Sequence, residues 1–222
     1  MAVGGVIARL ERIRPDWLED EFRHAVIAFG GGALFSAVAL VLAPEGSKHH
    51  GPLMVALLFG GGGVAFLLVD LALAAMKSSA AQLAAMLSDF IPESLAMGAA
   101  FATGDPSAPL LALLIGIQNL PEGFNAYREL RESSNLSSRT ILVAFAVMSL
   151  LGPVAALVGL FFLSAQPSTV GGIMLFAAGG ILYLTFQDIA PQAKLDNRWA
   201  PPLGAVAGFL LGLVGQMLVD GA

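Results

Sequence analysis

Seven long apolar stretches constrain this chain more than any other feature of its sequence. They cover residues 22–43, 52–76, 80–103, 107–127, 140–164, 169–190 and 201–219. Each is close to the roughly 20 apolar residues that an α-helix needs to cross the hydrocarbon core of a bilayer. Only 12% of the 222 residues are charged, against roughly 25% in a soluble domain. The sequence therefore predicts an all-α, polytopic membrane bundle with seven transmembrane helices.

The connections between these stretches are short and rich in turn-forming residues, as in PEGSKHHGP, TGDPSAP and QAKLDNRWAPP. Because no connection is long enough for a second domain, residues 1–222 are expected to form one transmembrane domain. Residues 1–21 have two interpretations: a cytoplasmic, amphipathic interfacial segment, or the remnant of a first span. The second is favoured, because AVGGVIARLERIRP resembles the last turn of an apolar helix entering a basic loop.

Basic residues are distributed very unevenly between the two sides of the predicted bundle. With the N-terminus on the cytoplasmic side, only Lys48 faces outward. The basic residues that then face the cytoplasm are Arg9, Arg12, Arg14, Arg23, Lys77, Arg128, Arg131, Arg139, Lys194 and Arg198. Since cytoplasmic loops of membrane proteins carry an excess of Lys and Arg, we expect a cytoplasmic (inner) membrane protein whose C-terminus is extracytoplasmic.

Two of the apolar stretches resemble one another. FGGGALFSAVALVLAP at residues 29–44 and FAAGGILYLTFQDIAP at residues 176–191 both begin with Phe and end with Ala-Pro, at an offset of 147. The stretches that follow them end in LLVD at Asp70 and MLVD at Asp220, at an offset of 150. Since the two copies would run in opposite directions, we expect an inverted repeat of hairpins 22–76 and 169–219 around the central pair 80–103 and 107–127.

The central pair carries two Pro-Glu units, in LSDFIPES (residues 87–94) and GIQNLPEG (residues 116–123). Asp89 and Glu93 share one face of a helix, as do Gln118 and Glu122, because each pair is four residues apart. On antiparallel neighbours these four side chains converge near the middle of the membrane, where a charge is costly. A divalent cation would offset the repulsion between the carboxylates; the alternative is protonated carboxyl groups that hydrogen-bond neighbouring helices.

Other polar residues give weaker signals. Asn119 is a candidate secondary ligand, although an amide that links helices is at least as good an interpretation. His49 and His50 are candidates for capturing metal at the outer entrance, and an ordinary polar loop is the favoured interpretation. For Asp70 and Asp188, near cytoplasmic helix ends, solvated interfacial roles are favoured.

The two Pro-Glu units resemble those of the ZIP (Zrt-, Irt-like protein) family of divalent metal transporters, in particular its bacterial branch. QNLPEG at residues 118–123 differs in one residue from the fifth-span motif of that family, and DFIPES at residues 89–94 is a looser version of the fourth-span motif. The resemblance implies an eight-helix fold that here lacks the first span. It also implies a primary metal site on Asp89, Glu93, Gln118 and Glu122.

The chain departs from the family pattern at three positions around a second, bridged metal. Phe90, Asn119 and Gly152 stand where relatives carry stronger ligands, so the resemblance implies one metal per chain. The primary site also lacks histidine. Because zinc favours nitrogen and sulfur ligands, we expect a narrowed preference for zinc over other metals, with Zn, Mn or Fe as the transported substrate.

Three function classes follow from these observations. The first is a divalent cation transporter, with a metal ion and the lipid bilayer as partners and a homodimer left open. The second is a degenerate ZIP-like protein that acts as a metal sensor or scaffold. The third, an intramembrane hydrolase, is not expected, because no nucleophile motif accompanies the carboxylates. Nothing indicates nucleic acid, and the lack of cysteine excludes thiolate metal sites.

The predicted topology has a direct test. A reporter fused after Asn135 is expected on the cytoplasmic side and one fused at Ala222 on the opposite side, because three spans separate them and basic residues favour the cytoplasm. Paired activities of alkaline phosphatase and fluorescent protein fusions would measure this. Both reporters on one side would contradict the seven-span arrangement.

Overall fold

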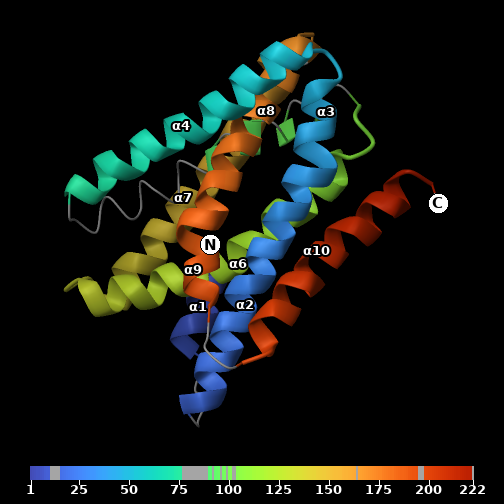
Figure 1. Cartoon of the computed structure of the whole chain (residues 1–222). Coiled ribbons are helices and arrows are strands. Elements are labelled where there is room, and N and C mark those ends of the chain that lie inside the picture. The colour runs from blue at the N-terminus through green and yellow to red at the C-terminus, as the bar shows by residue number, and fades with distance from the viewer. Residues whose placement is uncertain are drawn as a thin grey trace.

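The computed structural model describes residues 1–10, 16–76, 90–91, 93–95, 97–98, 100–101, 104–163, 165–194 and 198–221. Within these ranges all regular structure is helical, as the apolar stretches predict (Figure 1). Five segments are long and apolar enough to cross a membrane: Glu21–Ser47, Pro52–Ala75, Ser138–Leu163, Pro167–Ala193 and Ala200–Val219. The chain is thus a polytopic helical bundle, and the count of seven spans stays a prediction.

Most predicted stretches begin and end within a few residues of the observed helices. The N-terminal half contains α1 (Ala2–Leu10), α2 (Asp16–Ser36), η1 (Ala37–Leu42), α3 (Ala43–Ser47) and α4 (Pro52–Met76). The rest contains α6 (Ala108–Ser133), α7 (Ser138–Val158), η2 (Gly159–Leu163), α8 (Pro167–Leu184), η3 (Thr185–Ile189), α9 (Ala190–Ala193) and α10 (Ala200–Val219). The η segments are π-helical turns that continue the α-helices they follow. The predicted helix 80–103 lies mostly outside the described residues.

Helix α6 extends beyond its apolar stretch. The predicted break after residue 127 is wrong, because α6 continues to Ser133. This last part is amphipathic: Tyr127 and Leu130 are buried against Ile141 and Phe145 of α7, while Arg128 is half-buried and Glu129 is exposed. Hydropathy alone misses such an extension. The turn predicted before α6 is confirmed, with Gly104 at a φ of 70°, which glycine adopts without steric cost.

The short helix α1 packs along α6 and α7. Gly4 and Gly5 are buried on its packed face. A Cβ atom at Gly123 of α6 would lie 2.1 Å from the carbonyl oxygen of Met1, so the two backbones are in direct contact there. Helices in membranes commonly approach through such small residues.

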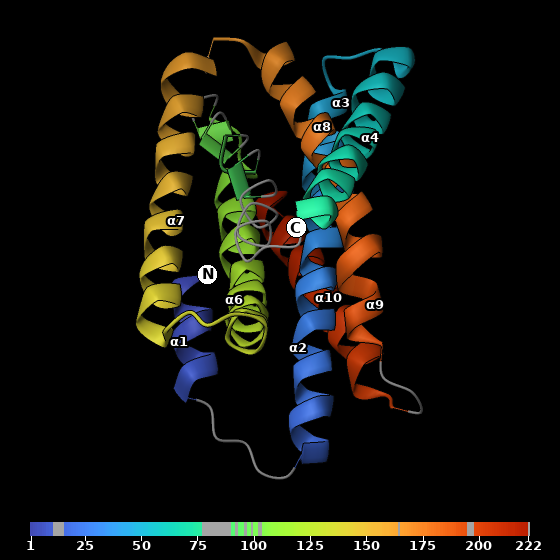
Figure 2. The same ribbon diagram turned by 90° about the vertical axis from the view of Figure 1, so that its left-hand side faces the viewer.

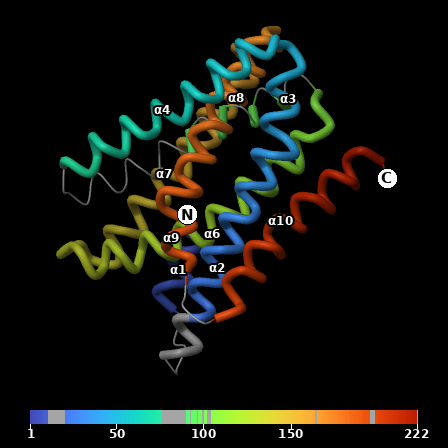
Figure 3. Tube along the Cα trace, viewed as in Figure 1, coloured from blue at the N-terminus to red at the C-terminus, as the bar shows by residue number. Residues whose placement is uncertain are grey.

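The other long helices pack in two pairs, α2 with α10 and α4 with α8. Both members of the first pair start at the end where α1 lies, and both members of the second pair start at the opposite end (Figures 1 and 2). The first halves of the two predicted repeats, α2 and α8, therefore run in opposite directions. Each pair joins one helix from each repeat, as the tube in Figure 3 also shows.

Equivalent glycine contacts hold the two pairs together. A Cβ atom at Gly32 would lie 2.0 Å from the carbonyl oxygen of Ala205, and one at Gly179 would lie 1.9 Å from that of Phe59. Since Gly32 and Gly179 differ by 147 positions, the contacts support the inverted repeat. A second matched set joins Gly208 to the carbonyl of Phe29 and Gly62 to that of Phe176, both at 2.0 Å.

These contacts also set the register of the second helices in each repeat. They relate α4 to α10 at an offset of 146 positions, as between Gly62 and Gly208, and not at the offset of 150 suggested by Asp70 and Asp220. The match between the LLVD and MLVD sequences is therefore not structural. The π-helical turns do follow the repeat, since η1 and η3 both precede an Ala-Pro pair.

Helix α6 lies beside α2 on one side and beside α1 and α7 on the other. Its apolar first half contributes Leu111, Leu114 and Ile115 to the main core, together with η1 and α8. Its second half carries QNLPEG and stays helical through Pro121. The packing of α6 against α2 therefore positions the predicted site.

The repeated glycine contacts give a matched pair of substitutions on one helix. Gly62→Ala in α4 is expected to lower the free energy of unfolding by about 1–3 kcal/mol, as overpacking does, because its Cβ would meet the carbonyl of Phe176. Gly61→Ala is the control, since no atom of the described residues outside its own helical turn lies within 4 Å of a Cβ there. Thermal unfolding in detergent measures both. Equal midpoints for the two variants would contradict the proposed role of the close contact.

Candidate functional site: a polar cavity beside α6

The best-defined polar contact in the predicted site joins Glu93 to Gln118. The side-chain amide Nε2 of Gln118 donates a hydrogen bond of 2.6 Å to Oε2 of Glu93. Both residues are 2% exposed. Two of the four side chains that are expected to converge are therefore in contact. A buried polar group needs such a partner, because leaving it unpaired costs about 1–3 kcal/mol.

Of the other two predicted ligands, the structure describes only Glu122. Asp89 lies outside the described residues, so its place in the site stays a prediction. Glu122 lies one turn beyond Gln118 on α6, and both residues line one cavity. Among the described residues no group of three or more His, Cys, Asp or Glu side chains gathers in metal-binding geometry. The four-residue metal site therefore stays a prediction.

The cavity beside Gln118 and Glu122 is about 420 Å³ in volume and lies between α2, α4, α6 and the η3–α9 segment. Its lining is unusual for a membrane protein interior, since it contains four carboxylates and three amides. The polar lining residues are Asp70, Gln118, Glu122, Asn125, Glu129, Asp188 and Gln192. None of the described residues that line it is basic. A cavity lined by a single sign of charge raises the local concentration of the opposite ion.

Four of these residues form a polar stripe along α6. Gln118, Glu122, Asn125 and Glu129 follow one another at spacings of four, three and four residues, so they share one face of the helix. The Pro-Glu units alone predict only Gln118 and Glu122. The helical period of polar residues beyond the apolar stretch also indicates Asn125 and Glu129. Asp70 and Asp188, for which the sequence favours solvated interfacial roles, line the same cavity.

The two asparagines of α6 have different surroundings. Asn125 links three helices: its amide donates to Oε1 of Gln192 at 3.0 Å, and its Oδ1 accepts from Nε of Arg23 at 3.2 Å. Asn119 is 6% exposed and donates to the carbonyl of Ile115 at 2.7 Å. Its Oδ1 is buried, with no hydrogen-bond partner among the described residues. Asn119 stays a candidate secondary ligand.

The phenyl ring of Phe90 fills the space beside Gly152. A Cβ atom at Gly152 of α7 would lie 2.2 Å from Cζ of Phe90 and 2.6 Å from Cε1. Any larger residue at position 152 would therefore displace the ring. An apolar ring also opposes a dehydrated ion beside it. This packing supports the expectation that the second metal position of the resemblance is lost.

Glycine allows a second close approach between the 90–101 segment and α7. A Cβ atom at Gly98 would lie 1.8 Å from the carbonyl oxygen of Ala156. Together with the Phe90–Gly152 contact, this places Glu93 on a segment packed tightly against α7. Gly98 therefore permits the close approach of this segment to α7.

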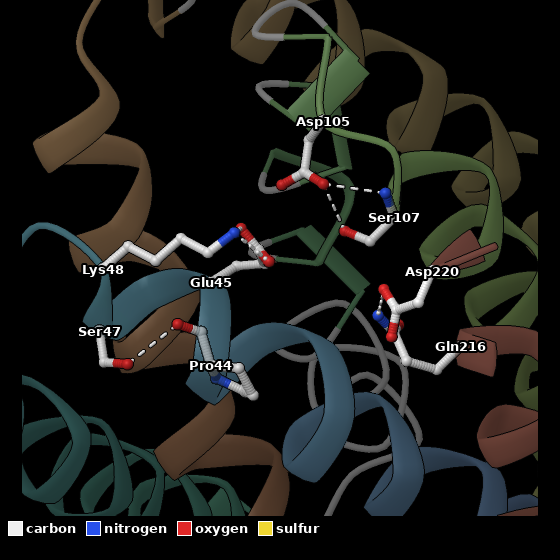
Figure 4. A network of polar contacts seen from close by, with 8 residues as sticks. All are labelled: Pro44, Glu45, Ser47, Lys48, Asp105, Ser107, Gln216 and Asp220. Carbon is white, nitrogen blue, oxygen red and sulfur yellow. Dashed lines mark hydrogen bonds and ion pairs between the residues drawn. The ribbon is translucent and has the colours of Figure 1, made fainter. Parts of the chain in front are cut away.

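Polar residues also gather at the other end of the molecule, where α3, the 104–107 turn and the end of α10 meet (Figure 4). The Lys48 ammonium pairs with Glu45 at 2.6 Å, and this hydrogen bond raises the pKa of Lys48 above its ordinary value. Asp105 accepts hydrogen bonds from the backbone and hydroxyl of Ser107. Since the Lys48 side chain is 59% exposed, the pair contributes little to stability.

The histidine pair near this end differs from a metal-binding arrangement in one respect. His50 Nε2 lies 2.9 Å from the carbonyl oxygen of Ser168 at the start of α8. A ring nitrogen in that contact serves as a donor to the backbone. His49 is exposed, and the candidate role of His49 and His50 at the entrance stays a prediction.

No protein-family model matches this chain. It is similar to the zinc transporter ZIPB of Bordetella bronchiseptica (strain ATCC BAA-588 / NCTC 13252 / RB50), with 34% identity over 127 residues. The match covers 54% of this chain and 40% of the relative. The chain therefore spans less than half the length of the curated relative that it matches.

The Phe90–Gly152 contact predicts a reciprocal pair of substitutions. Gly152→Ala is expected to lower the free energy of unfolding by about 1–3 kcal/mol, because the added methyl group overpacks against the ring. In the Phe90→Ala background the same substitution should cost much less, since the ring is gone. A double-mutant cycle by thermal unfolding measures the coupling. Additive effects would show that the two residues do not contact one another.

Proposed function

Because the similarity to a zinc transporter supports the membership of this chain in the ZIP family, we propose that it carries a divalent metal cation across a membrane. The metal is the substrate, held at the middle of the bundle by Glu93, Gln118 and Glu122, with Asp89 as the fourth predicted ligand. The observation that carries the proposal is the acidic cavity that begins at Gln118 and Glu122.

The charges around the cavity support a path for cations. Its lining includes Glu122, Glu129, Asp70 and Asp188, and its described lining residues include no basic side chain. Ionised carboxylates in the membrane are costly, and a divalent cation offsets that cost while it passes. The polar stripe of α6 leads from the buried Glu93–Gln118 contact toward the end of the helix, so it provides successive oxygen ligands for the ion.

The direction follows from the predicted orientation. With the end of α6 at the cytoplasm, the polar stripe leads inward from the site, and the protein imports metal at the cytoplasmic membrane. Each divalent ion that moves inward gains about 4.6 kcal/mol per 100 mV of membrane potential, twice the value for a single charge. The membrane potential therefore favours import.

The proposed site favours hard and borderline cations. Its predicted ligands are carboxylate and amide oxygens, which suit Mn²⁺ and related ions, whereas zinc prefers nitrogen and sulfur. We therefore propose Zn, Mn or Fe as substrates. A metal sensor or scaffold without transport is the alternative, and the continuous polar lining favours transport over it.

Removal of the central carboxylates tests the proposal. Glu93→Ala and Glu122→Ala are each expected to lower uptake of radioactive zinc or manganese into proteoliposomes at least ~10-fold, because loss of ligands weakens metal binding. Each variant should still insert and fold, since removal of one carboxylate from an acidic cluster relieves repulsion. Thermal unfolding in detergent checks the fold.

The matched control is Glu132→Ala, which removes an exposed carboxylate from the end of the same helix. It should transport at the parental rate. Parental uptake by either central variant would show that the site is misplaced. Metal binding without uptake by the unmodified protein would instead favour the sensor.

A further inference from the structure

A second depression lies on the outer surface of the bundle, between α2, the η3–α9 segment and α10. Its volume is about 780 Å³, within the range of roughly 300–1,000 Å³ typical of small-molecule sites. The lining is mostly apolar, with Phe35, Phe186, Val206, Phe209 and Leu210 among its residues. Since this surface belongs to spanning helices, the groove opens toward the hydrocarbon of the bilayer.

One end of the groove lies where α9 ends and α10 begins. Lys194, Pro201 and Pro202 line that end, and the connection between α9 and α10 continues from it. Trp199 in this connection is 81% exposed, and tryptophan is enriched where a membrane meets water. Arg198, beside Trp199, forms an ion pair with Glu21 at 3.5 Å. Basic side chains and an interfacial tryptophan thus mark the depth of the lipid headgroups.

The groove also adjoins the acidic cavity. Gly31 and Ile189 line both depressions. A Cβ atom at Gly31 would lie 2.8 Å from Cγ2 of Ile189, so these two residues are in contact and form a thin wall. An apolar molecule bound in the groove would keep water away from the outer side of that wall.

We propose that the groove is a binding site for one anionic glycerophospholipid of the surrounding membrane. An acyl chain lies along Phe186, Val206 and Phe209, and the phosphate lies near Lys194 at the headgroup level. The apolar lining matches the acyl chain, and Lys194, the one charged residue among the described residues that line the groove, matches the anionic headgroup. Attraction of an anionic lipid by one basic residue is worth about 1 kcal/mol. The site does not depend on the proposed transport function.

Native mass spectrometry of the full chain, delipidated in detergent, tests the proposal. Phosphatidylglycerol and phosphatidylcholine with identical acyl chains are titrated separately. The first phosphatidylglycerol is expected to bind about 5-fold more tightly, the ratio that ~1 kcal/mol corresponds to. Lys194→Gln should remove this preference. Arg139→Gln, which removes a positive charge at the start of α7, is the control and should preserve it.

Steric filling of the groove is the second arm. Ala190→Phe places a ring in the groove from an exposed position and should weaken the first phosphatidylglycerol at least ~5-fold, the loss expected when ~1 kcal/mol of the interaction is removed. Ala146→Phe on the exposed face of α7 is the matched control. If Ala190→Phe does not fold, as judged by thermal unfolding, Val206→Trp replaces it with the same expectation.

Three results would overturn the proposal. Equal affinity for the two lipids in the parent protein would remove the anionic preference. Unchanged binding in folded Ala190→Phe or Val206→Trp would place the lipid elsewhere. A change in the ratio of monomer to dimer masses in the groove variants, with lipid binding unchanged, would assign the groove to a second copy of the chain.

Discussion

A carboxylate inside the hydrocarbon region must find polar partners within the protein, and the arrangement around α6 depends on this constraint. Glu93 meets it through the short hydrogen bond from Gln118. Both residues need neighbouring helices close enough to exclude lipid, since an exposed charge at this depth is costly. The contacts of Gly98 with Ala156 and of Phe90 with Gly152 provide that closeness on the side of α7. Small residues beside the polar pair therefore help to keep lipid away from it.

The opposite wall of the cavity comes from the two helix pairs. Backbone contacts at Gly32 and Gly179 bring α2 to α10 and α4 to α8, so that α2 and η3 together face the polar stripe of α6. Because a glycine contact has no flexible side chain to adjust, it fixes the distance between two helices. The pairs therefore form a rigid support for α6. Gly30 of α2 contacts Pro121 of α6 closely, since a Cβ atom at Gly30 would lie 2.8 Å from Cγ of the proline.

The sequence predicted the helices well because hydropathy alone determines which stretches lie in lipid: the stretch 52–76 coincides with α4. It also predicted the Glu93–Gln118 contact, since a four-residue spacing on antiparallel helices allows few other arrangements. It missed what hydropathy does not report. The extension of α6 to Ser133 depends on Leu130 packing against α7. The correspondence between α4 and α10 in the two repeats depends on backbone contacts that the LLVD and MLVD sequences do not encode.

Both repeats contain a π-helical turn at the same place, but the side chains that it carries have different surroundings. Each has a π-helical turn before an Ala-Pro pair, η1 in one and η3 in the other. In η1 the turn carries Val41 and Leu42, both fully buried in the core. The equivalent positions in η3 are Asp188 and Ile189, which line the acidic cavity. A π-helical turn shifts the side chains that follow it around the helix axis, and such turns are frequent at functional sites. The equivalent turns thus place apolar side chains in the core in one repeat and a carboxylate beside α6 in the other, so the inverted repeat is asymmetric where a cation path is proposed.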